Sequence, residues 1–137
     1  MKPKSFKFSK YHKGRVSPLF YTSQSLVFGK YGILALQSKR IKSSTISAVI
    51  FSLKRILKPH GRLWSRIYPH FPVTSKPTEV RMGKGKGSID YWMATVRPGV
   101  ILFEFTCTTD MQAKIIYKLV NSKLPIKTTL VYKKNPQ

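Results

Sequence analysis

One stretch in the second half of the chain combines residue types that could bind phosphate. It reads VRMGKGKGSIDYW and runs from Val80 to Trp92. Three glycines alternate with two lysines, so the backbone there is accessible and the surroundings are positive. Accessible backbone N–H groups beside lysines are a common way for proteins to bind phosphate oxygens. The stretch therefore predicts contact with a phosphate-bearing ligand, unless it is merely a mobile, solvated loop.

The glycine spacing excludes the two common nucleotide-binding motifs. A Walker loop needs GxxxxGK[ST] between a strand and a helix, whereas this segment contains no GK[ST] and precedes a predicted strand. The dinucleotide fingerprint GxGxxG fails because position 88 is Ser88. The remaining interpretation is a narrow cationic loop that suits an RNA backbone packed too tightly for bulky side chains.

The charge of the whole chain favours a polyanionic partner. The chain has 26 Lys and Arg residues against 4 Asp and Glu residues, a formal net charge of +22. Residues 1–78 hold 16 of the basic residues and no acid, while residues 79–137 hold the other 10 and all four acids. Such a charge repels itself in the folded state. Nucleic acid, an anionic membrane surface or an acidic protein could neutralise it.

Few residues could perform acid–base or metal chemistry. The four carboxylates are scattered over half the chain and form no evident pair, so we expect no enzyme and no cofactor. The single cysteine, Cys107, excludes an internal disulfide and a CxxC metal site, and we expect its thiol to be buried. His12, His60 and His70 lack the spacing of metal ligands, so we expect them at the surface or facing RNA.

The first residues predict a basic arm. Their sequence, MKPKSFKFSKYHKGR, interleaves lysines with Phe6, Phe8 and Tyr11 and shows no helical stripe. We expect an arm that orders on RNA, with lysines on phosphates and rings on bases or on the domain surface; a disordered solvated tail is the alternative. The residues expected to bind RNA are Lys2, Lys4, Lys7, Lys10, His12, Lys13 and Arg15.

Length and composition indicate one domain with a core of its own. We expect a basic arm at residues 1–22, a single α+β domain at 23–133 with a long loop at 72–89, and a short tail at 134–137. No apolar run approaches the roughly 18–20 residues that a membrane-spanning helix needs.

The first half of the domain predicts two strands and a helix. Residues 26–38 favour two short strands broken at Gly29 and Gly32. An apolar stripe at helical spacing follows, formed by Ile46, Val49, Ile50, Leu53 and Leu57. Ser43 or Ser44 could cap the start of this helix, and Pro59 with Gly61 closes its end. A basic cluster lies off the stripe near the C-terminus of the helix, and we add it to the RNA-binding set: Lys54, Arg55 and Lys58.

The second half predicts more strands and a second helix. Residues 62–71 favour a strand, whose Arg62 and Arg66 join the RNA-binding set. After the loop, residues 90–96 and 100–106 predict a hairpin turned at Arg97–Gly99. A capping box at Thr109–Gln112 starts a helix that buries Ala113, Ile116 and Val120, and residues 126–132 favour a last strand. The order is β-β-α-β-loop-β-β-α-β, an α+β sandwich with a mostly antiparallel or mixed sheet and two helices.

Five blocks of the sequence together resemble a known family. They are KFSKYHKGR (7–15), GRLWSRIYP (61–69), FPVTSKPTEVRMGKGKGSIDYW (71–92), RPGVILFEF (97–105) and KLPIKTTLV (123–131). In order and spacing they resemble the large-subunit ribosomal protein sixteen family of bacteria and organelles. The likeness covers nearly the whole chain, and EVRMGKGKG is its most specific part.

The resemblance implies a fold and a role. It implies a two-layer sandwich of the α/β-hammerhead type that binds large-subunit ribosomal RNA below the central protuberance, near the A-site tRNA and among neighbouring large-subunit proteins. It also implies late joining to the subunit and no catalysis by the protein itself. The loop that would reach toward the peptidyl-transferase region and the A-site tRNA comprises Lys76, Arg81, Met82, Gly83, Lys84, Gly85, Lys86 and Gly87.

One helix departs from the family pattern. Family members commonly carry a Glu and paired basic residues along the first helix, where this chain has Ser47, Ala48, Ile50 and Phe51. This departure puts the RNA contacts of that helix in doubt. Ile50 and Phe51 could pack on an extra partner protein or deepen the core.

Two observations bear on the compartment, and two other functions stay open. The family pattern begins by residue 7, so we expect no presequence. Enrichment in Ile, Phe, Tyr, Lys and Ser fits an AT-rich organelle genome, which favours a mitochondrion over a plastid or a bacterial cytoplasm. The other functions are a free-standing RNA-binding or RNA-chaperone protein, and a cationic membrane-surface protein that uses the helix at 44–58.

Overall fold

The computed structural model describes residues 1–16 and 25–133, and they form an α+β fold. Its elements in chain order are β1 (Tyr31–Ala35), β2 (Lys39–Lys42), α1 (Ser43–Leu57), β3 (Arg62–Ser65), β4 (Phe71–Ser75), β5 (Ser88–Val96), β6 (Ile101–Thr106), α2 (Asp110–Lys123) and β7 (Thr128–Tyr132). Every strand pairing among these elements is antiparallel. The predicted fold class is confirmed.

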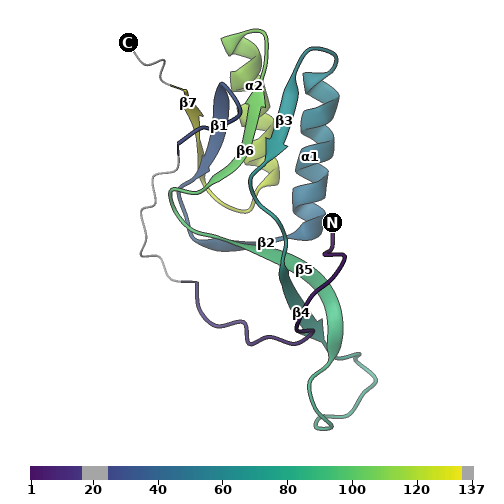
Figure 1. Cartoon of the computed structure of the whole chain (residues 1–137). Helices are drawn as coiled ribbons and strands as arrows, with labels where there is room; N and C mark the ends of the chain where they lie inside the picture. The colour runs from purple at the N-terminus through teal and green to yellow at the C-terminus, as the bar shows by residue number, and fades with distance from the viewer. Residues whose placement is uncertain (17–24, 134–137) are drawn as a thin grey trace.

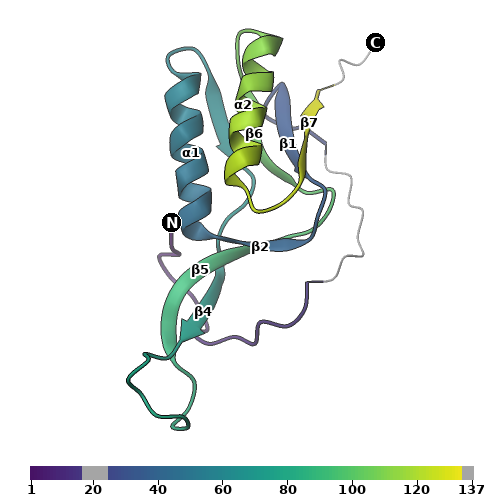
Figure 2. The same cartoon turned by 180° about the vertical axis from the view of Figure 1, so that it is seen from behind.

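The body of the molecule is a four-stranded sheet covered by two helices. The strand order is β3-β6-β1-β7, and α1 and α2 lie side by side over one face (Figures 1 and 2). The stripe of α1 packs into the core through Ile46, Val49 and Leu53, all fully buried. The prediction that this stripe belongs to the core is confirmed, so α1 offers no free apolar stripe to a membrane. Neither helix in the described part of the chain is long and apolar enough to span a bilayer.

A second, smaller sheet forms a handle that projects from the body. Its order is β2-β5-β4, and β4 and β5 make a long hairpin that ends in the loop of residues 76–87 (Figure 1). Strand β5 is long enough to reach from β2, beside the body, to the base of this loop. The sheet therefore holds the glycine-rich loop away from the hydrophobic core.

The long loop predicted at 72–89 is wrong at both ends. Residues 71–75 form β4, and β5 begins at Ser88. Pro72 lies inside β4, which is tolerated because β4 is an edge strand and its missing N–H leaves no partner unsatisfied. The single strand predicted at 62–71 is also wrong. Strand β3 ends at Ser65, and Phe71 already belongs to β4 of the second sheet.

The hairpin predicted between residues 90–96 and 100–106 does not form. The turn exists, since the N–H of Val100 donates to the carbonyl of Arg97 and Gly99 has a φ of 84°. It carries the chain from one sheet into the other, so β5 and β6 do not pair. The end of β1 holds this corner, because Ala35 donates to Val100 and accepts from Gly99, both at 2.9 Å.

The predicted strand break at Gly32 is also wrong. Gly32 lies inside β1 and pairs with Glu104 on one side and Val131 on the other, so two strand partners outweigh its intrinsic preference for a turn. Only Gly29 lies outside a strand. Residues 26–38 therefore hold one strand, β1, instead of the two predicted, and β2 follows at Lys39–Lys42, outside the predicted range.

The two helix starts differ in how well they were predicted. Neither Ser43 nor Ser44 caps α1; its N-cap is Lys42, because β2 runs straight into the helix and keeps Lys42 extended. Thr109 caps α2 as predicted, and its side chain accepts from the N–H of Gln112 at 3.3 Å. The side-chain oxygen of Gln112 accepts from the hydroxyl of Thr108, so only the Thr109 half of the predicted capping box is confirmed.

Cys107 is half-buried, which corrects the prediction of a buried thiol. It follows β6 at the edge of the core, and its sulfur lies 3.4 Å from the carbonyl of Thr109. Burial raises the pKa of this thiol despite its partial exposure.

Candidate RNA interface

The tip of the glycine-rich loop is held by backbone conformations that favour glycine. Gly83, Lys84 and Gly85 have consecutive positive φ values of 94°, 56° and 85°. The Lys76 ammonium donates to the carbonyl of Gly83 and so braces the loop from inside. The side chains at the tip point into solvent, and Met82 is 99% exposed. The loop therefore presents backbone and cations together, as its sequence predicted.

The base of the loop is closed by a very close approach of two backbone segments. A Cβ placed on Gly87 would lie 2.1 Å from the carbonyl oxygen of Ser75. No side chain fits there, because real Cβ contacts stay beyond about 3 Å. Gly87 thus fixes where the loop leaves the hairpin, whereas Gly83 and Gly85 shape its tip.

The arm lies along the second sheet. The ring of Phe6 meets Trp92 of β5 edge-on, with centroids 5.1 Å apart, and the ring of Tyr11 lies 5.3 Å from Phe71 of β4. Both aromatic anchors of the arm therefore contact the domain surface in the free chain. The predicted segment continues to residue 22, but residues 17–22 fall outside the described residues.

Hydrogen bonds tie the arm to the loop. The ammonium of Lys10 donates to the carbonyl of Lys86 at 3.0 Å, and the ammonium of Lys86 donates to the carbonyl of Tyr11. These lysines are 76 positions apart in sequence. The exchange makes one continuous cationic surface, here called the arm–loop surface, from residues 1–16 and 76–87.

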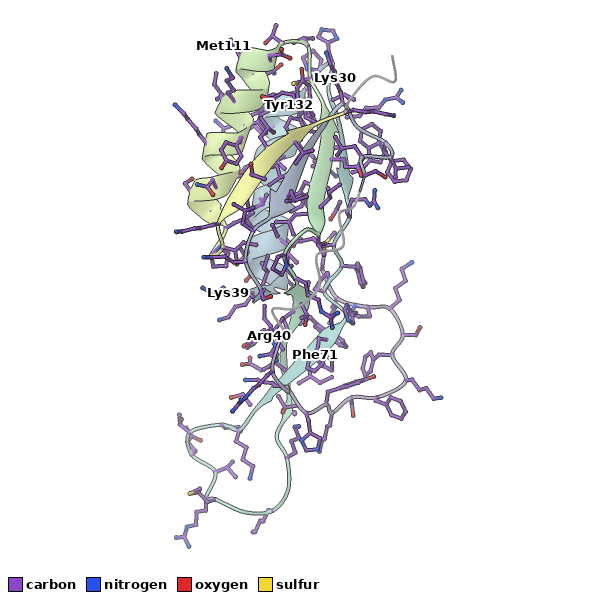
Figure 3. All side chains as sticks on the ribbon, turned by 90° about the vertical axis from the view of Figure 1, so that its left-hand side faces the viewer. Lys30, Lys39, Arg40, Phe71, Met111 and Tyr132 are labelled. Carbon is purple, nitrogen blue, oxygen red and sulfur yellow. The ribbon has the colours of Figure 1, made fainter. Side chains whose placement is uncertain are left out.

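Arg40 is an anchor of the arm that the sequence prediction missed. Its guanidinium donates to the carbonyls of Lys13 and Gly14, each at 2.6 Å. Figure 3 labels Arg40 and Phe71 at the junction of body and handle, with Lys39 close by. The signal was present in the sequence, since Lys39, Arg40 and Lys42 make a basic run on one short strand.

Most of the side chains predicted to bind RNA are exposed to solvent. The exposed members on the arm are Lys2, Lys4, Lys7, Lys10, His12, Lys13 and Arg15, and those of the loop are Lys76, Arg81, Lys84 and Lys86. His60 and His70 are exposed as well. Within residues 1–16 and 25–133, His, Cys and acidic residues form no group that could hold a metal ion.

The helix group lies away from the arm–loop surface. Lys54, Arg55 and Lys58 are exposed at the C-terminal end of α1, and Arg62 is exposed at the start of β3. This end of α1 is the far end from the handle (Figure 1). The structure therefore divides the predicted residues into two separate basic surfaces.

Arg66 differs from the rest because its charge is already paired. Its guanidinium forms an ion pair with Glu104, which is fully buried, and lies 5.7 Å from the centre of the Phe28 ring. The second oxygen of Glu104 accepts from the backbone N–H groups of Val27, Phe28 and Gly29 at 3.1, 2.7 and 2.9 Å. Burial opposes the charge of Glu104, but these bonds and Arg66 outweigh it and lower its pKa.

A family model of known proteins matches this sequence. It is described as ribosomal protein L16p/L10e, and the match covers residues 3–131. The chain belongs to this family. The resemblance seen in the five sequence blocks is confirmed.

Curated relatives support the same membership along nearly the whole chain. Three of them carry the name large ribosomal subunit protein uL16. The protein of Bartonella henselae is 46% identical over 131 residues, 96% of each chain. Those of Buchnera aphidicola subsp. Baizongia pistaciae and Wigglesworthia glossinidia brevipalpis are 44% and 43% identical over 133 residues, 97% of each chain.

The first helix of this member of the ribosomal protein L16p/L10e family exposes a large apolar side chain. Ile50 packs against the core, which was one of the two roles predicted for this pair, whereas Phe51 is 74% exposed. Phe51 lines a shallow pocket between α1 and α2 with Ile56 and Leu119. Deepening of the core thus accounts for Ile50 but not for Phe51.

Proposed function

We propose that this chain is a structural constituent of the large ribosomal subunit that binds its ribosomal RNA. The observation that carries the proposal is the joining of arm and loop through Lys10 and Lys86. It turns two basic segments far apart in sequence into one surface on a neutral core, the arrangement that a phosphate backbone needs. Family membership and the names of the relatives support the same role.

The loop meets the most crowded part of the proposed site. We place its tip near the peptidyl-transferase region and the A-site tRNA, with the body below the central protuberance and beside neighbouring large-subunit proteins. Support comes from the projecting handle and from the bare backbone at Gly83 and Gly85, which lets the tip approach RNA closely. In this proposal the protein shapes and stabilises RNA and does not itself catalyse a reaction.

The proposed compartment is the mitochondrial ribosome. The support is compositional: the chain is rich in the Lys, Ile, Phe, Tyr and Ser that AT-rich coding sequences favour. Detection of the protein in purified mitochondria tests this placement. Detection in plastids, or in a bacterial cytoplasm, would replace it and leave the ribosomal role intact.

Sedimentation tests the ribosomal role. Lysate is run on a sucrose gradient at about 0.5 M salt, which strips most proteins held loosely by phosphate contacts alone. We expect this protein in the large-subunit fractions. Recovery at the top of the gradient would overturn the proposal in favour of a free-standing RNA-binding or RNA-chaperone protein.

The role of the loop has a separate test. We expect the double variant Arg81→Ala, Lys84→Ala to assemble into subunits but to slow tRNA accommodation, because the tip loses two exposed cations while the loop base is untouched. The matched control, Lys114→Ala with Lys118→Ala, removes the same charge from the exposed face of α2. Pre-steady-state translation kinetics compare the two, and equal rates for both would sink the proposed role of the tip.

A further inference from the structure

A pocket lies where the first residues of the arm cross strand β5. Its volume is about 430 Å³, within the range of pockets that hold small organic groups. The arm contributes Lys2, Pro3, Lys4 and Phe6, and the strand contributes Ile89, Asp90 and Trp92. The pocket thus exists only because the arm packs on the second sheet.

The walls of the pocket combine rings with cations. Phe6 leans edge-on against Trp92, which is only 7% exposed beneath it, and half of the Phe6 side chain remains open to solvent. Lys2 and Lys4 also line the pocket, and both have exposed side chains. Aromatic faces beside lysines are the groups that take up an unstacked RNA base and its phosphate.

Asp90 is the unexpected member of this set. Two of the other three acids have partners within the fold, since Glu104 pairs with Arg66 and Asp110 accepts from the hydroxyl of Tyr31. Asp90 is exposed, and within the described ranges no ion pair involves it. A carboxylate on an RNA-facing surface repels phosphate, so its presence there weakens binding unless it contacts a base.

The backbone of β5 is irregular at Asp90, which lines the pocket. In the β4–β5 ladder Val73 pairs with Tyr91 and Thr74 pairs with Ile89, so Asp90 is the extra residue of a β-bulge. In a regular strand Ile89 and Asp90 would face opposite sides of the sheet. The bulge explains why both line the same pocket, and bulges commonly redirect a side chain in this way at binding sites.

We propose that this pocket holds one unstacked guanine of the RNA that the chain binds, with Asp90 reading its Watson–Crick edge. Guanine presents N1–H and N2–H side by side, and one carboxylate accepts both bonds through its two oxygens. Adenine presents a bare N1 acceptor at that place, and each pyrimidine offers a single donor position there. The half-exposed ring of Phe6 holds the base and the lysines hold its phosphates. The inference rests on the proposed function in so far as RNA is the ligand.

Short RNAs that differ in one base test this assignment on the full chain. The probe is an oligouridine of about nine nucleotides, a length within the site sizes of single-strand binders, with a central guanosine, inosine or adenosine. We expect guanosine to bind about tenfold more tightly than adenosine, the discrimination of one good bidentate pair. Inosine lacks the N2 amino group and is expected between the two. Fluorescence anisotropy at fixed salt measures the affinities.

Two substitutions of equal charge provide the control. Asp90→Asn and Glu79→Gln each remove one exposed acid and so lessen the repulsion of phosphate. Glu79→Gln is expected to raise the affinity for all three RNAs to a similar extent, whereas in Asp90→Asn the guanosine RNA also loses the bonds to the carboxylate. Only Asp90→Asn is expected to abolish the preference for guanosine. A wild-type chain without that preference, or a preference that survives Asp90→Asn, would overturn the proposal.

Free GMP separates a base within RNA from a free nucleotide. We expect GMP to bind at least about tenfold more weakly than the guanosine RNA, because the arm then neutralises one phosphate group instead of several. Equal affinity would overturn the assignment to RNA. The gradient experiment does not depend on base identity. If the protein sediments with the subunit but shows no preference for guanosine, only the pocket proposal is refuted. If it prefers guanosine but stays at the top of the gradient, only the ribosomal role is refuted.

Discussion

Glu104 shows at the scale of one residue how a strongly basic chain uses a scarce acid. Its carboxylate is fully buried, and it collects three backbone N–H groups and the guanidinium of Arg66. These bonds attach the segment before β1 to strand β6. A buried charge is tolerated when its hydrogen bonds are satisfied, and the loss of either partner is then costly.

We expect Glu104→Gln to lower the free energy of unfolding by about 2–4 kcal/mol at neutral pH, because the amide cannot replace the charge-assisted bonds. The pKa of Glu104 is lowered by folding, so its stabilisation is present above about pH 4.3, the ordinary value, and is lost as pH falls through the folded pKa. The difference in the free energy of unfolding between Glu104→Gln and the wild type should therefore become smaller in acid. Urea unfolding at pH 7 and pH 3 measures it.

Glu79→Gln is the control, because Glu79 is exposed in the loop. Its stability should stay within about 0.5 kcal/mol of the wild type. A gap between Glu104→Gln and wild type that keeps its size at pH 3 would show that packing, not charge, explains the loss.

At the scale of elements, the arm behaves as part of the fold of the free chain. Two ring contacts and the bonds from Arg40 hold it on the second sheet, although it has no helix or strand of its own. Its lysines then extend the surface that begins at the loop. Binding RNA with an arm already in place requires less ordering than binding with a free tail.

We expect Phe6→Ala to shift the fluorescence of Trp92 to longer wavelength, because Phe6 covers a ring that is otherwise 7% exposed. A Trp64→Phe background isolates this signal. Phe8→Ala is the matched control, since the ring of Phe8 packs on Tyr11 within the arm. An identical spectrum for Phe6→Ala and its parent would show that the arm leaves this sheet in solution.

Loss of the arm should also impair assembly. Without residues 1–15 we expect lower occupancy of the protein in large subunits, since most of one basic surface is lost. Quantitative detection of the truncated chain across the gradient measures this occupancy, and wild-type occupancy would show that the arm is dispensable.

At the scale of the whole molecule, charge and core are separated. The described core is apolar except for Glu104 and Thr128, while the residues predicted to bind RNA, Arg66 apart, lie on the arm–loop surface at one end and in the helix group at the other. Two such surfaces suit a protein that bridges separate RNA segments. Arg66 belongs to neither, because its charge is used inside the fold.

We expect binding to a large-subunit ribosomal RNA fragment to weaken steeply with salt. The logarithm of the binding constant should fall with the logarithm of the salt concentration, with a slope of roughly 0.7–0.9 per phosphate neutralised. Arg62→Gln should lower this slope by the amount of about one phosphate contact, because this side chain is exposed. Arg66→Gln should leave the slope nearly unchanged and lower stability instead. Affinities over a salt series and urea unfolding of each variant test this difference, and equal slopes for both variants would contradict it.

The sequence by itself located the two helices and indicated the class of partner. Helical spacing from Ile46 to Leu57 and the cap at Thr109 depend on neighbours a few positions away, so local pattern located both helices. Net charge and the alternating glycines and lysines indicated phosphate for the same reason: these are properties of residue types, not of contacts.

Tertiary structure decided how those elements meet. The turn at Arg97–Gly99 could be predicted from the sequence. That β5 and β6 lie in different sheets depends on their other partners, because β5 pairs with β4 and β6 pairs with β1. The pairing of Arg66 with Glu104, the exchange between Lys10 and Lys86 and the bulge at Asp90 all join residues that are distant in sequence or depend on strand register. Such contacts follow from packing of the whole chain, which no local pattern records.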